Sequence, residues 1–297
     1  LREAGVESIR IIERAGDFCG TWYWNRYPGC ACDIESYIYL PMIEETGYMP
    51  VEKYSKAPEI YAYCCQLGAR YDLYPAALFQ TGVTGMRWDD ERARWIVSTS
   101  RDDEIAARFT IIAGGILSQP KLPRIPGIES FAGHSFHTSR WDYAYTGGDS
   151  RGNLTGLAGK TVGIIGTGPT AIQCIPFLGE HAKHLYVFQR TPSSCDPRDN
   201  RPTDPEWAKS LQPGWQKHRI ENFNNIISGI PEPEDLVADG WTDILSTIGF
   251  LDDEGAPPDP EAMALAELAK MEKSRRRIDT IVKDPKTAAA LKPYYNY

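Results

Sequence analysis

The chain has 297 residues, 42% of them hydrophobic, a composition typical of a soluble globular protein with one large domain or two ordinary ones. Its 40 Asp and Glu residues outnumber its 32 Lys and Arg residues, giving a formal charge of -8 without a basic stripe for nucleic acid. No apolar run approaches the roughly 20 residues of a membrane helix, and the first residues lack the pattern of a secretory signal. We therefore expect a cytoplasmic protein that binds neither nucleic acid nor a membrane.

The 7 cysteines form no recognisable framework. Their number is odd and none has Cys-x-x-Cys spacing, so the pattern fits neither a set of disulfides nor a zinc site. We expect most of them to be reduced and buried, and we expect no metal. A redox or metal role stays open only for the pair Cys30 and Cys32, because Cys-x-Cys alone is weak support for such a role.

The first predicted strand, residues 6–13, is an apolar run that ends in Glu13. This pattern is typical of the second strand of a dinucleotide-binding unit, whose terminal acid accepts hydrogen bonds from a ribose. In such units a glycine loop lies about 20 residues before the acid, which here would place it ahead of Leu1. Together with the aromatic ending at residues 294–297, this leads us to expect a fragment of a longer protein.

A cluster of glycine, aromatic residues and an acid follows between Gly20 and Asp33. Gly20 would let the backbone pass close to a pyrophosphate, and Trp22 and Trp24 offer flat apolar walls for a large ring. A carboxylate at Asp33 could hold a cationic partner by a charge-assisted hydrogen bond. The alternative is that the aromatic residues belong to the core and that Asp33 caps the turn beginning at Ile34.

The next stretch predicts one helix and several strands. Residues 59–71 have apolar positions at helical spacing, with Pro58 at the start. Strand-like pieces follow at residues 79–88, 95–98 and 109–113, separated by turn-forming residues. We expect a small antiparallel excursion that returns to a strand ending in small residues, where backbone could approach a cofactor.

Residues 147–159, rich in Gly, Ser and Asn, predict an exposed interdomain loop. A buried strand is then predicted at residues 160–165, a glycine loop from Gly166, and a helix at residues 170–181. This order of strand, turn and helix is the one that binds a pyrophosphate through backbone amides and the helix dipole. Residues 184–189 are the next predicted strand.

The glycine loop has the pattern Gly-x-Gly-x-x-Ala, in which Ala171 replaces a third glycine that is needed only for close packing. Arg190 ends the next strand, where an enzyme that prefers NADH would carry an acid, so the arginine favours the 2′-phosphate of NADPH. Thr191 and Gln189 are candidates for additional hydrogen bonds. The alternative for Arg190 is a solvated surface arginine. The predicted binding residues of the loop itself are Gly166, Thr167, Gly168, Thr170 and Ala171.

Residues 131–142, FAGHSFHTSRWD, stand shortly before this loop, and the string resembles the fingerprint of the Baeyer–Villiger monooxygenases. The segment from Gly20 to Asp33 resembles the Gly-x-Trp…Tyr-Pro-Gly…Asp motif of the same family, and the resemblance covers nearly the whole chain. It implies that the fingerprint is a hinge between two domains, with His137 not acting as a base. The residues that carry the fingerprint are Phe131, Gly133, His137, Trp141 and Asp142.

The family resemblance implies an α/β fold with two Rossmann-like dinucleotide-binding domains, both incomplete, and a mainly helical insertion. The FAD-binding domain would span residues 1–145, without its first strand and glycine loop. The first part of the NADP-binding domain would span residues 146–203, and the helical insertion residues 204–297. Within that insertion, Asp204 and residues 260–283 carry helix-start and helical patterns of their own.

The resemblance also implies that FAD and NADPH are used to insert one oxygen atom of O2 next to a ketone carbonyl, giving an ester or a lactone. The stretch at residues 111–131 resembles family members that act on bulky or polycyclic ketones. Asp33 is carried over as a catalytic residue that helps to position a catalytic arginine and the cofactor. The other residues carried over for FAD are Glu13, Gly20, Thr21 and Trp22.

No segment matches the family's Lys-Arg motif, which would come after Tyr297, so we expect this polypeptide alone to be inactive. Two alternatives stay open. A flavin-dependent N- or S-monooxygenase would share both nucleotide-binding units, although Asp33 and the Trp-Asp pair of the fingerprint favour ketones. A non-catalytic dinucleotide-binding remnant would explain the missing motifs.

Overall fold

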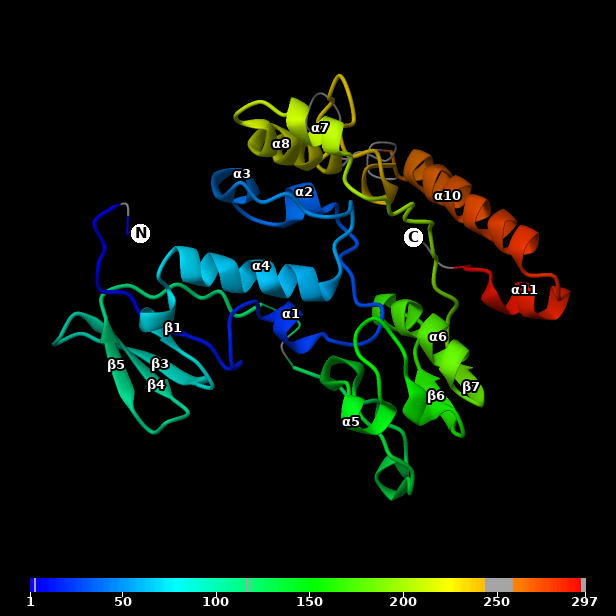
Figure 1. Ribbon diagram of the computed structural model, residues 1–297, viewed down its shortest axis with the longest axis horizontal. Coiled ribbons are helices and arrows are strands. Elements are labelled where there is room, and N and C mark those ends of the chain that lie inside the picture. Colours follow the sequence, from blue (N-terminus) through cyan, green and yellow to red (C-terminus); the bar gives the residue numbers. More distant parts are fainter. Residues whose placement is uncertain (3, 116, 118, 244–258, 295–297) are drawn as a thin grey trace. The chain divides into compact units, whose positions relative to one another are not determined.

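The computed structural model describes residues 1–2, 4–115, 117, 119–243 and 259–294 (Figure 1). The chain forms two units. The first consists of Leu1–Cys30 and Ala57–Arg151, and the second of Ala31–Lys56 and Gly152–Tyr297. Parts of two sequence predictions lie outside the described residues: positions 116 and 118 of the ketone-related stretch, and positions 244–258 and 295–297 of the helical region.

Helix α4 (Ala57–Arg70) is the longest element of the first unit and confirms the helix predicted over residues 59–71. Pro58 stands in its first turn, where a missing backbone N–H is tolerated. Ile60 and Tyr63 lie three residues apart on one face and are both about 1% exposed. The other helices and strands of this unit are β1 (Ile11–Ile12), α1 (Thr21–Trp24), β2 (Ala77–Leu78), β3 (Val83–Asp89), β4 (Arg94–Thr99), β5 (Glu104–Ala107) and α5 (Tyr143–Thr146).

Strands β3, β4 and β5 form an antiparallel sheet, seen as three adjacent arrows in Figure 1. β3 and β4 overlap the strands predicted at residues 79–88 and 95–98, whereas β5 was not predicted. Trp88 pairs with Trp95 across β3 and β4, and their rings meet edge to face at 5.6 Å. The predicted strand at residues 109–113 is wrong, since that segment has no regular structure and its apolar side chains are exposed. A strand needs a neighbour for its backbone hydrogen bonds, and the apolar pattern by itself cannot supply one.

The predicted strand at residues 6–13 is reduced to Ile11–Ile12, which pairs in parallel with the equally short β2. The paired part of β1 can be no longer than β2, because each residue of the ladder needs a residue opposite it. Glu13 nevertheless stands directly after the strand, as the sequence predicts.

The second unit contains the strand, glycine loop and helix predicted around Gly166. Strand β6 (Thr161–Ile165) pairs in parallel with β7 (His184–Phe188), and helix α6 (Pro169–His181) connects and contacts both strands (Figure 1). The expectation that β6 is a buried strand is wrong for most of its residues: Ile164 is 7% exposed, but Ile165 is 58% exposed. A two-stranded sheet covered by one helix leaves its other face open within the described residues.

The remaining elements of the second unit are helices. Described parts of residues 204–297 are mainly helical, as predicted, and Asp204 caps the first of these helices by accepting a hydrogen bond from the Glu206 backbone N–H at 2.9 Å. Asp259 caps the longest helix in the same way. No described helix is both long enough and apolar enough to cross a bilayer. These helices are α2 (Ser36–Tyr39), α3 (Ile43–Thr46), α7 (Pro205–Ser210), α8 (Trp215–Ile227), α10 (Pro260–Ile281) and α11 (Pro285–Leu291).

The two units do not follow the predicted domains one to one. The stretch Ala31–Lys56, which the sequence analysis assigns to the FAD-binding domain, packs with the second unit. The switch from the first unit to the second falls after Arg151, inside the predicted interdomain loop. The domain bounds from the sequence therefore stay a prediction.

Candidate functional site

The first group of candidate residues lies at the end of β1 in the first unit. The Glu13 backbone N–H donates to the carbonyl oxygen of Leu78 at 3.0 Å, and one carboxylate oxygen accepts from the Ala15 N–H at 2.7 Å. The side chain is thereby fixed at the strand's carboxyl end, where cofactors bind in open parallel sheets.

Gly20 precedes helix α1, which contains Thr21 and Trp22. Its backbone has φ of 48° and ψ of −107°, a conformation that other residues rarely adopt. No heavy atom lies within 4 Å of the point where a Cβ would stand, so this face of the backbone is open. This open face leaves room for the close approach of a ligand, which stays a prediction for this position.

A disulfide between Cys19 and Cys64 stands next to Gly20, with the two Cα atoms 5.5 Å apart. The sequence analysis missed this pair, because 45 positions separate the two cysteines and neither carries a spacing signal. Cys30, Cys32 and Cys174 are buried outside any disulfide, as expected, whereas Cys65 is half-buried and Cys195 is exposed. Among the described residues, no cluster of His, Cys, Asp or Glu could hold a metal ion.

Burial raises the pKa of the Cys30 thiol to about 11 and that of the Cys32 thiol to about 12. Both thiols are therefore protonated near neutral pH, whereas redox chemistry and metal binding need the thiolate. Their burial and raised pKa values give the redox or metal role that the sequence left open no support.

The fingerprint residues fold into consecutive turns of the first unit. The Phe131 ring lies against Gly133, and a Cβ on this glycine would lie 2.5 Å from a ring atom. Trp141 donates through Nε1 to Thr146 Oγ1 at 3.1 Å. Asp142 caps α5 and also contacts Nε2 of His134 at 2.9 Å.

His137 caps the 3₁₀ turn Thr138–Arg140, with Nδ1 accepting a hydrogen bond from the Ser139 N–H at 3.2 Å. Burial, and then the neighbouring Arg140 charge, lower its pKa below the ordinary 6.5. A neutral imidazole that caps a turn has a structural task. The expectation that His137 is not a base stays a prediction.

Two contacts join the fingerprint and Tyr143, the residue directly after it, to the segment after Gly20 within the first unit. The guanidinium of Arg140 lies 3.7 Å from the ring centroid of Trp24. The hydroxyl of Tyr143 donates to the carbonyl oxygen of Arg26. The structure thus brings together two motifs that lie more than 100 residues apart in the sequence.

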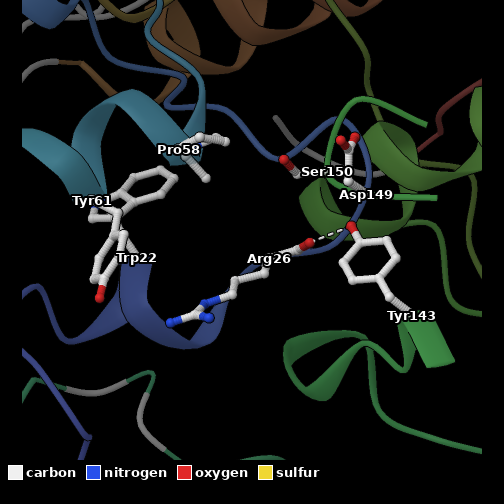
Figure 2. A pocket seen from close by; sticks show the side chains of 8 residues that line it. Trp22, Arg26, Pro58, Tyr61, Tyr143, Asp149 and Ser150 are labelled. Atoms are coloured by element: carbon white, nitrogen blue, oxygen red, sulfur yellow. Dashed lines mark hydrogen bonds between the residues drawn. The ribbon is translucent and has the colours of Figure 1, made fainter. Parts of the chain in front are cut away.

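A cavity of about 240 Å³ opens between these elements. Figure 2 shows Arg26 between the aromatic side chains of Trp22 and Tyr61 on one side and Tyr143 on the other. Trp22 comes from α1, and Tyr61 from the first turns of α4. The other lining residues are Ala57, Pro58, Asp149 and Ser150. Trp22 is the one predicted site residue among those that line this cavity.

Asp33 lies in the second unit together with Ala31 and Cys32, whereas the part of its motif up to Cys30 belongs to the first unit. Its carboxylate oxygen Oδ2 is 3.6 Å from Nη2 of Arg198, and its carbonyl oxygen accepts a hydrogen bond from Trp241 Nε1 at 3.1 Å. It does not cap helix α2, whose N-cap residue is Glu35. The sequence analysis missed Arg198 and Trp241, which no local pattern connects with Asp33.

Glu35 is the buried anion of this region, with 1% of its side chain exposed. Both carboxylate oxygens accept hydrogen bonds from Arg219 of helix α8, and Lys53 Nζ lies 3.7 Å away. Burial lowers the pKa of Lys53, although the nearby Glu35 charge acts in the opposite direction. This buried cluster fixes the backbone two residues after Asp33.

The Ala31 backbone ties the same segment to helix α6. Its carbonyl oxygen accepts from Nε2 of Gln173 at 3.0 Å, and its N–H donates to Oε1 at 3.4 Å. Because Gln173 stands just after the first turn of α6, the Asp33 segment is docked beside the glycine loop within one unit.

The loop itself leaves its backbone open. Gly166 has φ of 99°, and no heavy atom lies within 4 Å of a Cβ placed on Gly166 or Gly168. No side chain caps the 13-residue helix α6, whose first turn holds Thr170 and the 7% exposed Ala171. Exposed amides at the positive end of a helix dipole favour an anion such as a phosphate.

Arg190 is exposed just after β7, at the same edge of the sheet as the Gly166 loop. Thr167 and Thr191, both predicted, lie together, since the Thr167 hydroxyl donates to the Thr191 carbonyl at 3.3 Å. Gln189 instead donates to the carbonyl oxygen of Ala290 at 2.7 Å, so its amide is held by helix α11. The arrangement places the exposed Arg190 at the same sheet edge as a loop with open backbone.

No protein-family model matches the chain. The chain is 56% identical over 300 residues to the pentalenolactone D synthase of Streptomyces exfoliatus, a match that covers 99% of this chain and 51% of the synthase. It is 50% identical over 302 residues to a Baeyer–Villiger monooxygenase of Streptomyces coelicolor, covering 100% of this chain and 50% of that protein. The chain spans about half the length of these curated relatives.

Solved structures also match this chain over about half of their own length. The polycyclic ketone monooxygenase from the thermophilic fungus Thermothelomyces thermophila matches with a TM-score of 0.90 and 43% identity, over 100% of this chain and 51% of that one. A structure of OTEMO in complex with FAD and NADP matches with a TM-score of 0.78 and 32% identity, over 98% of this chain and 56% of that one. The chain therefore has the mixed α/β fold of these proteins over about half their length.

Proposed function

We propose that this chain, which belongs to the Baeyer–Villiger monooxygenase family, carries cofactor-binding residues of an FAD- and NADPH-dependent enzyme that inserts one atom of O2 next to a ketone carbonyl. The product would be an ester or a lactone. The observation that carries the proposal is the identity of 50% with a monooxygenase of that name over the whole chain. The fold assignment of two Rossmann-like domains with a helical insertion, bounded at residues 145 and 203, is part of the same proposal.

The residues around Gly166 fit NADPH. The open backbone of Gly166 and Gly168 and the uncapped start of α6 would hold the pyrophosphate, with Thr170 as a further donor. Ala171 would keep the helix close to the strand, and Thr167 and Thr191 would shape the loop between them. Arg190 would bind the 2′-phosphate, because it is an exposed cation at the end of the adjacent parallel strand.

The residues around Gly20 fit one part of an FAD site. Glu13 would accept hydrogen bonds from the ribose, and the open face at Gly20 with the backbone of Thr21 would pass along the phosphates. Trp22 would contact the ring system from the wall of the cavity. The flavin, when bound, would supply the oxygen chemistry. In the second unit, the Asp33 carboxylate would help to position a catalytic arginine and the cofactor.

In this proposal, the fingerprint would act as the hinge between the FAD-binding and NADP-binding domains. Its turns are held by internal contacts of Gly133, His137, Trp141 and Asp142, and they dock onto the segment after Gly20 through Arg140. A rigid turn fixed to one nucleotide-binding segment and followed at once by the interdomain loop has the placement of a hinge.

We further propose a bulky or polycyclic ketone as the substrate. Support comes from the printed names of two relatives, a polycyclic ketone monooxygenase and a pentalenolactone D synthase. The expected cytoplasmic location stays a prediction.

The test is to purify the protein encoded by the complete reading frame and to record its flavin spectrum and its oxidation of NADPH. A polycyclic ketone, an amine and a sulfide are offered in parallel. We expect a yellow protein whose NADPH consumption rises with the ketone and which forms an ester or lactone. Oxidation of only the amine or sulfide would instead indicate an N- or S-monooxygenase, and a colourless protein would indicate a non-catalytic remnant.

A further inference from the structure

We infer that Arg198 is a positioning residue that sets the orientation of the Asp33 carboxylate, and that Trp241 fixes the carbonyl group of the same residue. The inference rests on the proposed function, in which Asp33 belongs to the active site. Both partners come from the stretch after β7, far from Asp33 in the sequence. They therefore give two residues after β7 a role at Asp33 that no sequence motif indicates.

The backbone around Asp33 is fixed on both sides. Before it, Gln173 holds both backbone groups of Ala31. After it, Glu35 is locked by two hydrogen bonds from Arg219 and by the buried charge of Lys53. At Asp33 itself, the indole of Trp241 donates to the carbonyl oxygen. Contacts thus hold the chain at residues 31, 33 and 35, and the Asp33 side chain is the part whose orientation they leave open.

Arg198 is the cation that acts on this remaining freedom. Its Nη2 atom lies 3.6 Å from Asp33 Oδ2. Among the described residues, this is the one ion pair of the Asp33 carboxylate. The two side chains are 37% and 45% exposed. Ion pairs of this exposure contribute little to folding stability, so loss of Arg198 should leave the fold intact while it releases the carboxylate.

The segment that carries Arg198 is itself anchored. Asp196, two residues earlier, pairs with the buried Lys270 of helix α10 at 3.0 Å, and Lys270 also pairs with Asp243 at 2.6 Å. Asp243 stands two residues after Trp241, so one lysine links the backbone segments of both Asp33 partners. Because its segment is anchored in this way, Arg198 keeps its place and selects one orientation of the Asp33 carboxylate.

The experiment uses the protein from the complete reading frame and compares R198M, R198K and W241F with the wild type. The matched control is R201M, which removes an exposed arginine from the same segment, three residues further on. We expect R198M to lower kcat/KM for the ketone by roughly tenfold to a hundredfold, because small misplacements at a site have effects of that size. R198K should restore most of this loss, W241F should give a smaller loss, and flavin content and thermal midpoint should stay unchanged.

A double-mutant cycle tests whether Arg198 acts through Asp33. In a D33N background, R198M should cause no further loss. The inference is overturned if R198M is as active as R201M, or if R198M lowers kcat/KM by the same factor with and without the D33N change.

Crystal structures of the wild type and R198M separate this inference from the proposed function. The Asp33 carboxylate should change its rotamer or lose its order in R198M while the backbone stays in place, whatever reaction the protein catalyses. An unchanged carboxylate would overturn the inference. A displaced carboxylate in a protein that forms no ester would uphold the pairing and reject the proposed function.

Discussion

Gln173 pairs with the backbone of Ala31 much as one β-strand pairs with another, donating to its carbonyl oxygen at 3.0 Å and accepting from its N–H at 3.4 Å. One side chain of helix α6 thereby satisfies both polar groups of a residue in a non-helical segment. The pair connects the predicted pyrophosphate helix with the segment that carries Asp33. A single amide thus links two candidate motifs of the second unit directly.

Replacing Gln173 with Leu should destabilise the protein by about 1 to 3 kcal/mol, because it leaves a partly buried N–H and C=O without partners. Urea unfolding of the Q173L variant measures this free energy. The control is Q212L, because exposed Gln212 makes only a local bond to the Ser210 carbonyl. Equal unfolding free energies for Q173L and Q212L would show that the Ala31 contact does not stabilise the segment.

Replacing Glu35 with Gln should have a larger effect, about 3 to 5 kcal/mol, because it leaves Arg219 and the buried Lys53 without their anion. The same substitution at exposed Glu221, which pairs with Lys217, should change the free energy by less than about 1 kcal/mol. Thermal or urea unfolding of both variants provides the comparison. A Glu35 variant as stable as the Glu221 variant would contradict a structural role for the buried cluster.

Local signals in the sequence explain which elements could be predicted. Helix α4 and the order β6, glycine loop, α6 and β7 depend on apolar periodicity and on the positions of Gly and Pro, all visible within a dozen residues. The strand expected at residues 109–113 failed because an apolar run does not reveal whether a neighbouring strand exists to pair with it.

The candidate site was predictable only as separate motifs. Arg198 and Trp241 at Asp33, and Gln173 at Ala31, are partners chosen by the tertiary fold, with more than 100 residues between them and their targets. No periodicity marks such pairs. The disulfide partner of Cys19 was missed for the same reason, since position in the fold and not spacing selects it.

Arg190 should determine the preference for NADPH over NADH in the proposed enzyme. An Arg190→Ala change should raise KM for NADPH by roughly 10- to 100-fold, the range expected when a hydrogen bond to a charged group is lost, and leave KM for NADH unchanged. Initial rates with both cofactors measure the effect. The control is K183A, which removes an exposed cation just before the opposite end of β7. A similar rise in KM for both cofactors would contradict a contact with the 2′-phosphate.

His137 should make stability depend on pH. Because burial and Arg140 lower its pKa in the folded state, the folded protein binds the proton less readily than the unfolded chain. Its contribution to stability is fully present above about pH 6.5 and is lost as the pH falls from there through the lower pKa of the folded state.

We expect the free energy of unfolding to fall more between about pH 7.5 and about pH 5.5 in the wild type than in an H137N variant. Asn retains an acceptor for the turn but does not titrate. Exposed His218, replaced with Asn, is the control and should keep the wild-type pH dependence. Identical pH dependence in the wild type and H137N would show that His137 is not held neutral by the fold.

Isotope labelling tests the proposed activity most directly. The protein from the complete reading frame is supplied with NADPH, a polycyclic ketone and ¹⁸O₂, and the product is analysed by mass spectrometry. We expect one heavy oxygen atom in the ring or bridging position of the ester, with the carbonyl oxygen of the ketone retained. An unlabelled product, or NADPH consumption that yields hydrogen peroxide and leaves the ketone unchanged, would contradict the assignment.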